Sequence, residues 1–333
     1  MDYSTRYLLT AMIAEEAADL PCARRLYNQV LAHSRSRYDK SNRAYALFRL
    51  GAIARTHGHI SDALQYLRMA ARDARQDRRT LGRVLNTTGV VYMDTGHFQM
   101  AHKYFRHAKE VSLGAVADGL DAAILTNLGL VERKQGHFKK ALRYHSSALQ
   151  LSKMSRNRRA MCRDYGNIGT VYLRLTNYAE ALKAYTQATR FARIVGARDT
   201  LATVLMNQAI VLKHLSRFAK AERLAQEALQ IEKALRRTEG IARYLSLMAG
   251  IAQEKREYSK AIKSLHKAIR IQQKLGRREG LADDWSALGD CLNGLHRLSA
   301  AKSAYDKSNR YFQTLGNKAA IRTNLEKIRQ LAR

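Results

Sequence analysis

Three asparagines spaced forty residues apart are the residues whose type and spacing point most directly to chemistry: Asn127, Asn167 and Asn207. An asparagine side chain carries both a hydrogen-bond donor and an acceptor, so it can pair with the C=O and the N–H of a peptide bond at once. A row of such side chains would hold the main chain of an extended peptide without reading its sequence. The alternative is that these asparagines hydrogen-bond to neighbouring helices of their own chain.

When successive forty-residue segments of the sequence are aligned with one another, basic residues fall at positions next to these asparagines. They are Arg83, Arg133, Lys134, Arg163, Arg174, Lys213, His214 and Arg243. Guanidinium groups pair bidentately with carboxylates or phosphates. The pattern predicts a cationic surface that turns acidic at Glu254, Asp283 and Asp290, which would set the direction of an acidic ligand. Alternatively, some of these charges pair within the scaffold.

No catalytic or metal-binding arrangement emerges from the sequence. The eleven histidines fall mostly in predicted turns or on helix surfaces, and none has a cysteine or aspartate at triad or metal spacing. Cys22, Cys162 and Cys291 are odd in number and widely separated, so we expect reduced thiols that fill small buried spaces. We therefore expect a protein without enzymatic activity, metal or cofactor.

Composition favours a helical protein with anionic partners. The 333 residues include 59 Lys and Arg against 28 Asp and Glu, a formal charge of +31, with 46% hydrophobic residues and a single proline. A field of this size attracts anions and raises association rates. The N-terminal apolar run is too short for a signal peptide or a membrane span, so we expect a cytoplasmic protein with no membrane partner.

The elements that must position these residues follow a fixed period. Small residues recur forty residues apart, with one interval of 38, in a first column: Gly51, Gly89, Gly129, Gly169, Ala209, Ala249 and Gly289. A column of alanines follows twelve residues later in every unit, from Ala63 to Ala301. Apolar residues recur every three to four positions on both sides of the turn Gly136-His137-Phe138. Each unit is therefore predicted to form two amphipathic helices joined by a tight turn.

This pattern resembles the tetratricopeptide repeat. The resemblance rests on a large residue four before the first column, such as Leu125 or Trp285, on the small first-column residue, and on the alanine column. It implies an all-α, right-handed α-solenoid, or superhelix, of about eight helical hairpins plus a C-terminal capping helix. We expect one solenoid over residues 1–333, with a degenerate first repeat at 1–36, seven clear repeats at 40–315 and the capping helix at 316–333.

The forty-residue period is longer than the usual tetratricopeptide and is similar to that of Pins-type scaffolds, kinesin light chains and Rap-type regulators. That resemblance implies recognition of an extended partner along a concave wall lined by the first helix of each hairpin. The carboxylate clamp of chaperone-binding relatives is absent, because the clamp's lysine and asparagine positions hold residues such as Thr126 and Leu130.

The sequence thus favours an interaction scaffold that binds an acidic, extended protein or peptide segment in a basic groove. The second hypothesis is RNA or other nucleic acid in the same groove, since a charge of +31 suits phosphate neutralisation. Against it, nearly all aromatic residues fall in predicted core columns, whereas single-stranded recognition needs exposed rings for base stacking. Self-association through the ends of the solenoid is a further possibility.

Overall fold

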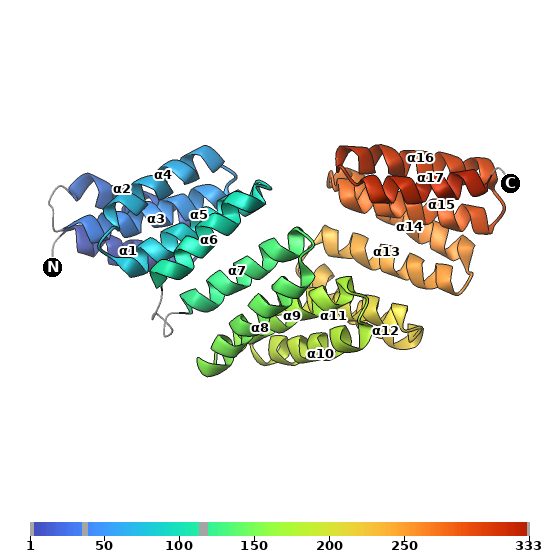
Figure 1. Cartoon of the computed structure of the whole chain (residues 1–333), viewed down its shortest axis with the longest axis horizontal. Helices are drawn as coiled ribbons and strands as arrows, with labels where there is room; N and C mark the ends of the chain where they lie inside the picture. Colours follow the sequence, from blue (N-terminus) through green and yellow to red (C-terminus); the bar gives the residue numbers. More distant parts are fainter. Residues whose placement is uncertain (1–2, 35–38, 113–118, 332–333) are drawn as a thin grey trace. The chain divides into compact units, whose positions relative to one another are not determined.

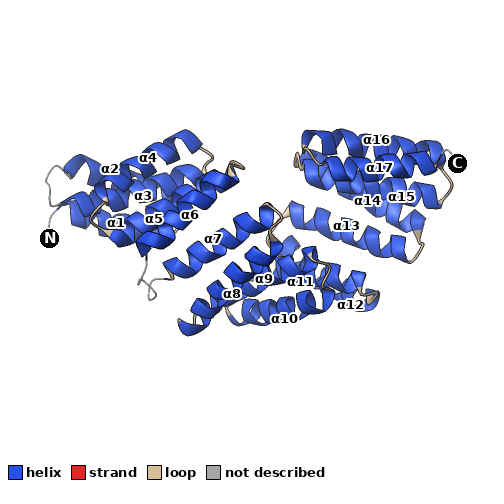
Figure 2. Cartoon of the chain, viewed as in Figure 1, coloured by secondary structure: helices blue, strands red, loops and turns tan. Residues whose placement is uncertain are grey.

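The computed structural model describes residues 3–34, 39–112 and 119–331. These residues form seventeen α-helices and no strand (Figure 1, Figure 2). The helices are α1 Tyr3–Glu16, α2 Leu20–His33, α3 Lys40–Thr56, α4 Ile60–Asp73, α5 Arg78–Asp94, α6 Phe98–Ser112, α7 Leu120–Lys134, α8 Phe138–Met154, α9 Arg158–Arg174, α10 Tyr178–Ile194, α11 Arg198–His214, α12 Phe218–Ala234, α13 Thr238–Glu254, α14 Tyr258–Lys274, α15 Arg278–Gly294, α16 Leu298–Thr314 and α17 Lys318–Gln330.

Contacts between helices divide the chain into two compact units, residues 1–175 and 176–333. The first unit contains the hairpins α1–α2, α3–α4, α5–α6 and α7–α8, followed by α9. The second unit begins with α10, continues with the hairpins α11–α12, α13–α14 and α15–α16, and ends with α17 packed on α16. Within each unit every helix packs on the next (Figure 1). The predicted all-α repeat of hairpins with a final single helix is confirmed.

The first-column glycines make room for a large side chain from the second helix of the same hairpin. A Cβ atom built on Gly89 would lie 2.5 Å from the Phe105 ring, and one built on Gly289 would lie 2.5 Å from the Tyr305 ring. Phe105 and Tyr305 are themselves buried. Where the first-column residue is Ala209, the equivalent second-helix residue is the small Ala225. The column therefore sets how closely the two helices of a hairpin approach.

His145 occupies this same second-helix position against Gly129, although the sequence pattern placed the histidines mostly at turns and surfaces. A Cβ on Gly129 would lie 2.5 Å from the His145 ring, and the ring is fully buried. Neither ring nitrogen has a hydrogen-bond partner within the described residues. Burial, reinforced by the nearby Arg133 and Arg163, lowers the pKa of His145 to about 4. This histidine therefore acts as a neutral aromatic filler.

Buried polar residues join successive hairpins at one recurring position, five residues before the first column. Asp164 of α9 accepts hydrogen bonds from Ser152 Oγ at 2.7 Å and Thr126 Oγ1 at 3.0 Å. Asn324 of α17, one repeat beyond Asp284, accepts from Ser286 Oγ at 2.9 Å and donates to Ser308 Oγ at 2.9 Å. The last helix is thus attached through the same kind of contact as the first helix of a further repeat.

The close approach at the glycine column predicts opposite effects for two glycine-to-alanine substitutions. Gly89→Ala gains helix propensity of ~1 kcal/mol but forces the Phe105 ring to move, which typically costs ~1–3 kcal/mol. Gly250→Ala meets only the flexible end of Lys213, at 3.4 Å, so it keeps the gain. Urea unfolding should show Gly89→Ala less stable and Gly250→Ala more stable than the parent chain. Equal effects at both positions would contradict this packing role.

The buried His145 predicts a pH-dependent loss of stability. Its pKa is lower in the folded chain than the ordinary 6.5, so the unfolded chain binds the extra proton more readily between pH 6.5 and about 4. The folded state then loses up to about 3 kcal/mol as pH falls through this window. His145→Phe, which copies Phe105, should remove that loss. Urea unfolding at pH 8 and pH 5 should therefore show a larger stability gain at pH 5, whereas the exposed control His107→Phe should show none.

Candidate ligand-binding surface

The predicted binding residues lie on the helices that begin each repeat. In the first unit they are Arg83 on α5, Asn127, Arg133 and Lys134 on α7, and Arg163, Asn167 and Arg174 on α9. In the second unit they are Asn207, Lys213 and His214 on α11, and Arg243 on α13. All of them are half-buried or exposed, as a surface role requires. The row of asparagines is divided between the two units, and each part is described separately.

In the first unit, one asparagine forms a hydrogen bond inside the scaffold, and the next forms none with the residues that the structure describes. Asn127 Nδ2 donates a hydrogen bond of 2.9 Å to Asn86 Oδ1 on α5. Asn167 has no hydrogen-bond partner among the described residues and is half-buried. The sequence left open whether the asparagines serve a ligand or neighbouring helices, and Asn127 does bond to a neighbouring helix. Its Oδ1 and second N–H remain available.

Two exposed cations accompany these asparagines at the same offset. Lys134 lies seven residues after Asn127 on α7, and Arg174 lies seven residues after Asn167 on α9. Seven residues are two helical turns, so each cation lies about 10 Å along the helix from its asparagine, on the same face. Neither cation makes an ion pair with any described residue. Because α7 packs against α9, these two asparagine–cation pairs lie on neighbouring helices, and we refer to them as the α7–α9 array.

Arg163 is less available than its neighbours. Its Nε lies 3.5 Å from Oδ1 of the buried Asp164, so the predicted alternative of pairing within the scaffold applies to this residue. Burial of the Asp164 carboxyl raises its pKa, and the guanidinium opposes that effect. The arginine therefore opposes the effect of burial on this carboxyl, as the hydrogen bond from Ser152 also does.

In the second unit, the asparagine is held by an arginine of the next hairpin. Arg243 Nη2 donates to Asn207 Oδ1 at 3.0 Å, which leaves the two amide N–H groups of Asn207 as donors. Burial lowers the pKa of Arg243, although the acidic Glu232 and Glu239 oppose this effect. Asn207 and Arg243 therefore form a fixed donor pair.

His214 has a role that the sequence did not indicate. Its imidazole stacks on the Tyr178 ring with centroids 4.8 Å apart and planes inclined by 8°. Burial and the adjacent Lys213 lower the pKa of His214, while Glu254 opposes them. At neutral pH this residue is therefore an uncharged, stacked ring rather than a cation.

The ends of the predicted cationic surface are neutralised by ion pairs. Arg49, two residues before the first column of its repeat, donates to Glu15 through Nε at 2.9 Å. In the second unit, Asp290 accepts from Lys327 Nζ at 2.7 Å and from Tyr305 Oη at 2.7 Å. The predicted acidic end is therefore weaker than the sequence indicated, because Asp290 is already paired.

A buried carboxylate with two histidines replaces the expected aromatic residue of one repeat. Glu132 lies three residues after Gly129, where other repeats place Tyr92 and Tyr172. It is buried, and its two oxygens lie 3.2 Å from His102 Nε2 and 2.8 Å from His137 Nδ1. The cluster ties α6 to the α7–α8 hairpin through polar contacts instead of ring packing.

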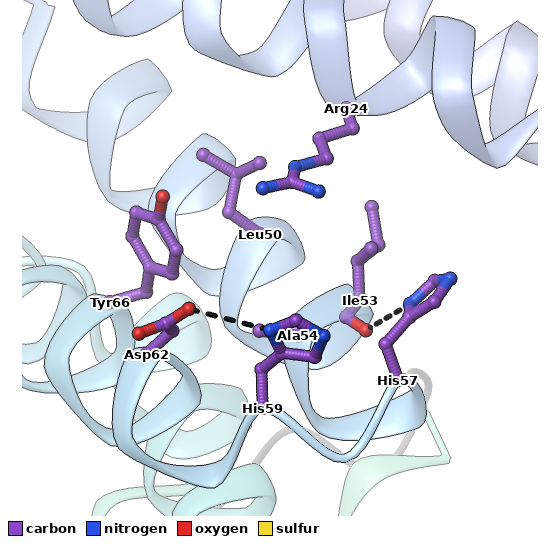
Figure 3. Close-up of a pocket in the computed structure, with 8 residues that line it drawn as sticks. All are labelled: Arg24, Leu50, Ile53, Ala54, His57, His59, Asp62 and Tyr66. Atoms are coloured by element: carbon purple, nitrogen blue, oxygen red, sulfur yellow. Dashed lines mark hydrogen bonds and ion pairs between the residues drawn. The ribbon is translucent and has the colours of Figure 1, made fainter.

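A small hollow of about 60 Å³ lies between α2 and the α3–α4 hairpin of the first unit. Figure 3 shows the side chains that line it. Its charges are partly balanced, since His59 Nδ1 lies 3.7 Å from Asp62 Oδ2. His57 Nδ1 donates to the Ile53 carbonyl at 2.9 Å, and the Tyr66 side chain lines one side (Figure 3). The side chains leave little room for a ligand.

Two other kinds of site are absent from the part of the chain that the structure describes. No group of three or more His, Cys, Asp or Glu residues there is arranged to hold a metal ion. Every helix within residues 3–34, 39–112 and 119–331 is too short or too polar to span a lipid bilayer.

The hairpin repeats and the polar rows on their first helices define a helical repeat scaffold. The sequence profile of the tetratricopeptide repeat family matches residues 120–194 and 165–234. No curated protein matches the chain at the level of sequence. Residues 120–234 therefore match tetratricopeptide repeats.

Several solved structures are similar in fold. The apo form of the quorum sensor NprR from B. thuringiensis is 16% identical, with a TM-score of 0.73 over 94% of this chain and 87% of that one. Apo RapI is 14% identical, with a TM-score of 0.69 over 82% of this chain and 99% of RapI. A Rap protein complexed with Competence and Sporulation Factor is 14% identical, with a TM-score of 0.65 over 99% and 97%. At these identities the similarity concerns the fold alone.

The different hydrogen bonding of Asn127 and Asn167 predicts different costs for their removal. Alanine raises helix propensity equally at both positions, so the comparison cancels this gain. Asn127→Ala also leaves Asn86 without its partner, which should cost about 1 kcal/mol. Urea unfolding should therefore find Asn127→Ala less stable than Asn167→Ala by about that amount. Equal stabilities would mean that the Asn86 contact contributes nothing.

Proposed function

We propose that this chain is a non-enzymatic interaction scaffold that binds an extended, acidic peptide or protein segment along the surface of its first helices. The observation that carries the proposal is the array on α7 and α9, where Asn167 has no described partner and the cations Lys134 and Arg174 are exposed and unpaired. An amide and two cations without described partners can bind a ligand that carries both peptide groups and carboxylates.

The geometry of the array suggests how such a ligand would lie. A peptide that crosses α7 and α9 would place its main chain over Asn127 and Asn167, whose amides can pair with peptide groups. Acidic side chains would reach Lys134 and Arg174, about 10 Å further along the helices. Each exposed charge pair contributes only ~0.2–1 kcal/mol, so useful affinity requires several such contacts together.

The similar solved structures are consistent with a ligand-holding role. One of them is a Rap protein in complex with Competence and Sporulation Factor, and another is the quorum sensor NprR. These descriptions concern those proteins, and for this chain they support only the general idea of a scaffold with a bound partner. Nucleic acid is the rival ligand, favoured by the formal charge of +31.

Selection from a displayed library of 12-residue peptides tests the proposal. The immobilised full chain should enrich peptides rich in Asp and Glu, whose affinity can then be measured by calorimetry. Asn167→Ala should weaken the best peptide about fivefold to tenfold, and the double variant Lys134→Glu, Arg174→Glu should weaken it at least tenfold.

The control carries the same charge change on a different surface. The double variant Lys263→Glu, Lys267→Glu on α14 should bind the selected peptide within about twofold of the parent chain. Enrichment of neutral peptides, or equal affinity of all variants, would contradict the proposal. Binding of a fluorescent 20-nucleotide oligo(U) that is lost in the α7–α9 variant would favour the rival ligand.

A further inference from the structure

A second, larger hollow lies between the second helices of the other unit. It is bounded by α10 and α12 over the middle of α11 and has a volume of about 430 Å³. Leu182, Leu212 and Leu224 supply apolar surface from the three helices. We refer to it as the α10–α12 groove. On α11 it is lined by Gln208 and Leu212, which lie on a different face of the helix from Asn207.

The rim of the α10–α12 groove carries uncompensated positive charge. Arg217, Lys220 and Arg223 line it, are exposed, and make no ion pair with any described residue. The single acidic residue of the lining is Glu227, and it is already paired with Arg193 through contacts of 2.8 and 3.1 Å. Three cations therefore face solvent beside an apolar surface, without a partner in this unit.

The wall of the groove is held in place by its own hydrogen bonds. Gln208 Nε2 donates to Thr186 Oγ1 at 3.1 Å, and Gln208 Oε1 accepts from Thr189 Oγ1 at 3.2 Å. These bonds join α10 to α11 across the bottom of the groove. A wall that is already ordered loses little conformational freedom when a ligand binds.

Comparison with the hollow in Figure 3 explains why this groove is open. The same repeat positions that hold His59, Asp62 and Tyr66 in the first unit hold Arg217, Lys220 and Leu224 here. A leucine in place of the tyrosine removes a ring from the lining, and a lysine in place of the aspartate reverses the charge. Tyrosine also occupies this position at Tyr104 and Tyr144, whereas the later repeats hold Ala184, Leu224, Ser264 and Ala304.

We propose that the α10–α12 groove is a docking site for an acidic segment of a partner protein, in which an aliphatic side chain between carboxylates enters the leucine-lined hollow. The basic side chains of the rim would form ion pairs with the carboxylates, and the leucines would bury the aliphatic side chain. Nucleic acid fits less well, because no aromatic residue lines the groove for base stacking. A second copy of this chain, with a charge of +31, would be repelled.

Binding of two synthetic peptides to the full chain tests this site. The probe is fluorescein-labelled (Glu-Glu-Leu)₄, and its matched control is (Glu-Glu-Ser)₄, which has the same charge. Fluorescence anisotropy at physiological salt should show the leucine peptide binding about tenfold more tightly than the serine peptide. Equal affinities would overturn the proposal, because charge alone would then explain binding.

Two variants locate the binding. Leu224→Tyr restores the ring found at Tyr66 without changing the charge, and it should weaken the leucine peptide about tenfold. Lys220→Asp copies Asp62 and provides a second variant if the tyrosine disturbs folding, which thermal unfolding monitors. Lys263→Asp, with the same charge change on α14, should bind within about twofold of the parent chain. Unchanged affinity in both groove variants would overturn the proposal.

Two further binding measurements distinguish peptide binding in the groove from binding at the α7–α9 surface and from binding of nucleic acid. The double variant Lys134→Glu, Arg174→Glu should bind the leucine peptide with the same affinity as the double variant Lys263→Glu, Lys267→Glu. The groove proposal is therefore tested independently of the function proposed for the α7–α9 surface. A labelled oligo(dT) of 20 nucleotides should not lose affinity in Leu224→Tyr. Loss of oligonucleotide binding in that variant would assign the groove to nucleic acid instead and overturn the proposal.

Discussion

The contact between a first-column glycine and a large side chain of the facing helix is the constraint on which each glycine-containing hairpin depends. At Gly89, Gly129 and Gly289 an added Cβ atom would lie 2.5 Å from a ring. The distance between the two helices is therefore fixed by a ring against a bare backbone. Because each hairpin keeps this spacing, residues at one offset in successive repeats of a unit come to lie on the same surface.

The same constraint explains how polar residues are tolerated inside the repeats. His145 takes a ring position and remains neutral, with its pKa lowered to about 4 by burial. Asp284, at the position equivalent to Asp164 and Asn324, is buried, and its pKa is raised to about 7 mainly by that burial. Such groups lower stability where a polar atom has no partner among the described residues, as at both ring nitrogens of His145 and at Asp284 Oδ2.

The basic residues of the chain differ in whether they are already paired with acidic residues of the chain itself. Several inner cations are already engaged, as in Arg49 with Glu15 and Arg163 with Asp164. Among the cations without described partners, two groups stand beside possible ligand contacts: those on α7 and α9 in the first unit and those around the α10–α12 groove in the second. Both are suited to carboxylates, and the groove also offers the apolar surface of three leucines, so the two places differ in the ligand they favour.

The sequence by itself determined the helices, their pairing and the face on which the candidate residues lie. A forty-residue period with small residues at fixed offsets leaves few other ways to bury its apolar positions. The tertiary structure decided which of those residues are available, for example that Asn127 bonds to Asn86 while Asn167 has no described partner. It also revealed the ring stacked on His214, the buried His145 and the groove at Leu224. Periodicity places a residue on a face, whereas its partners come from other repeats and depend on side-chain lengths and directions.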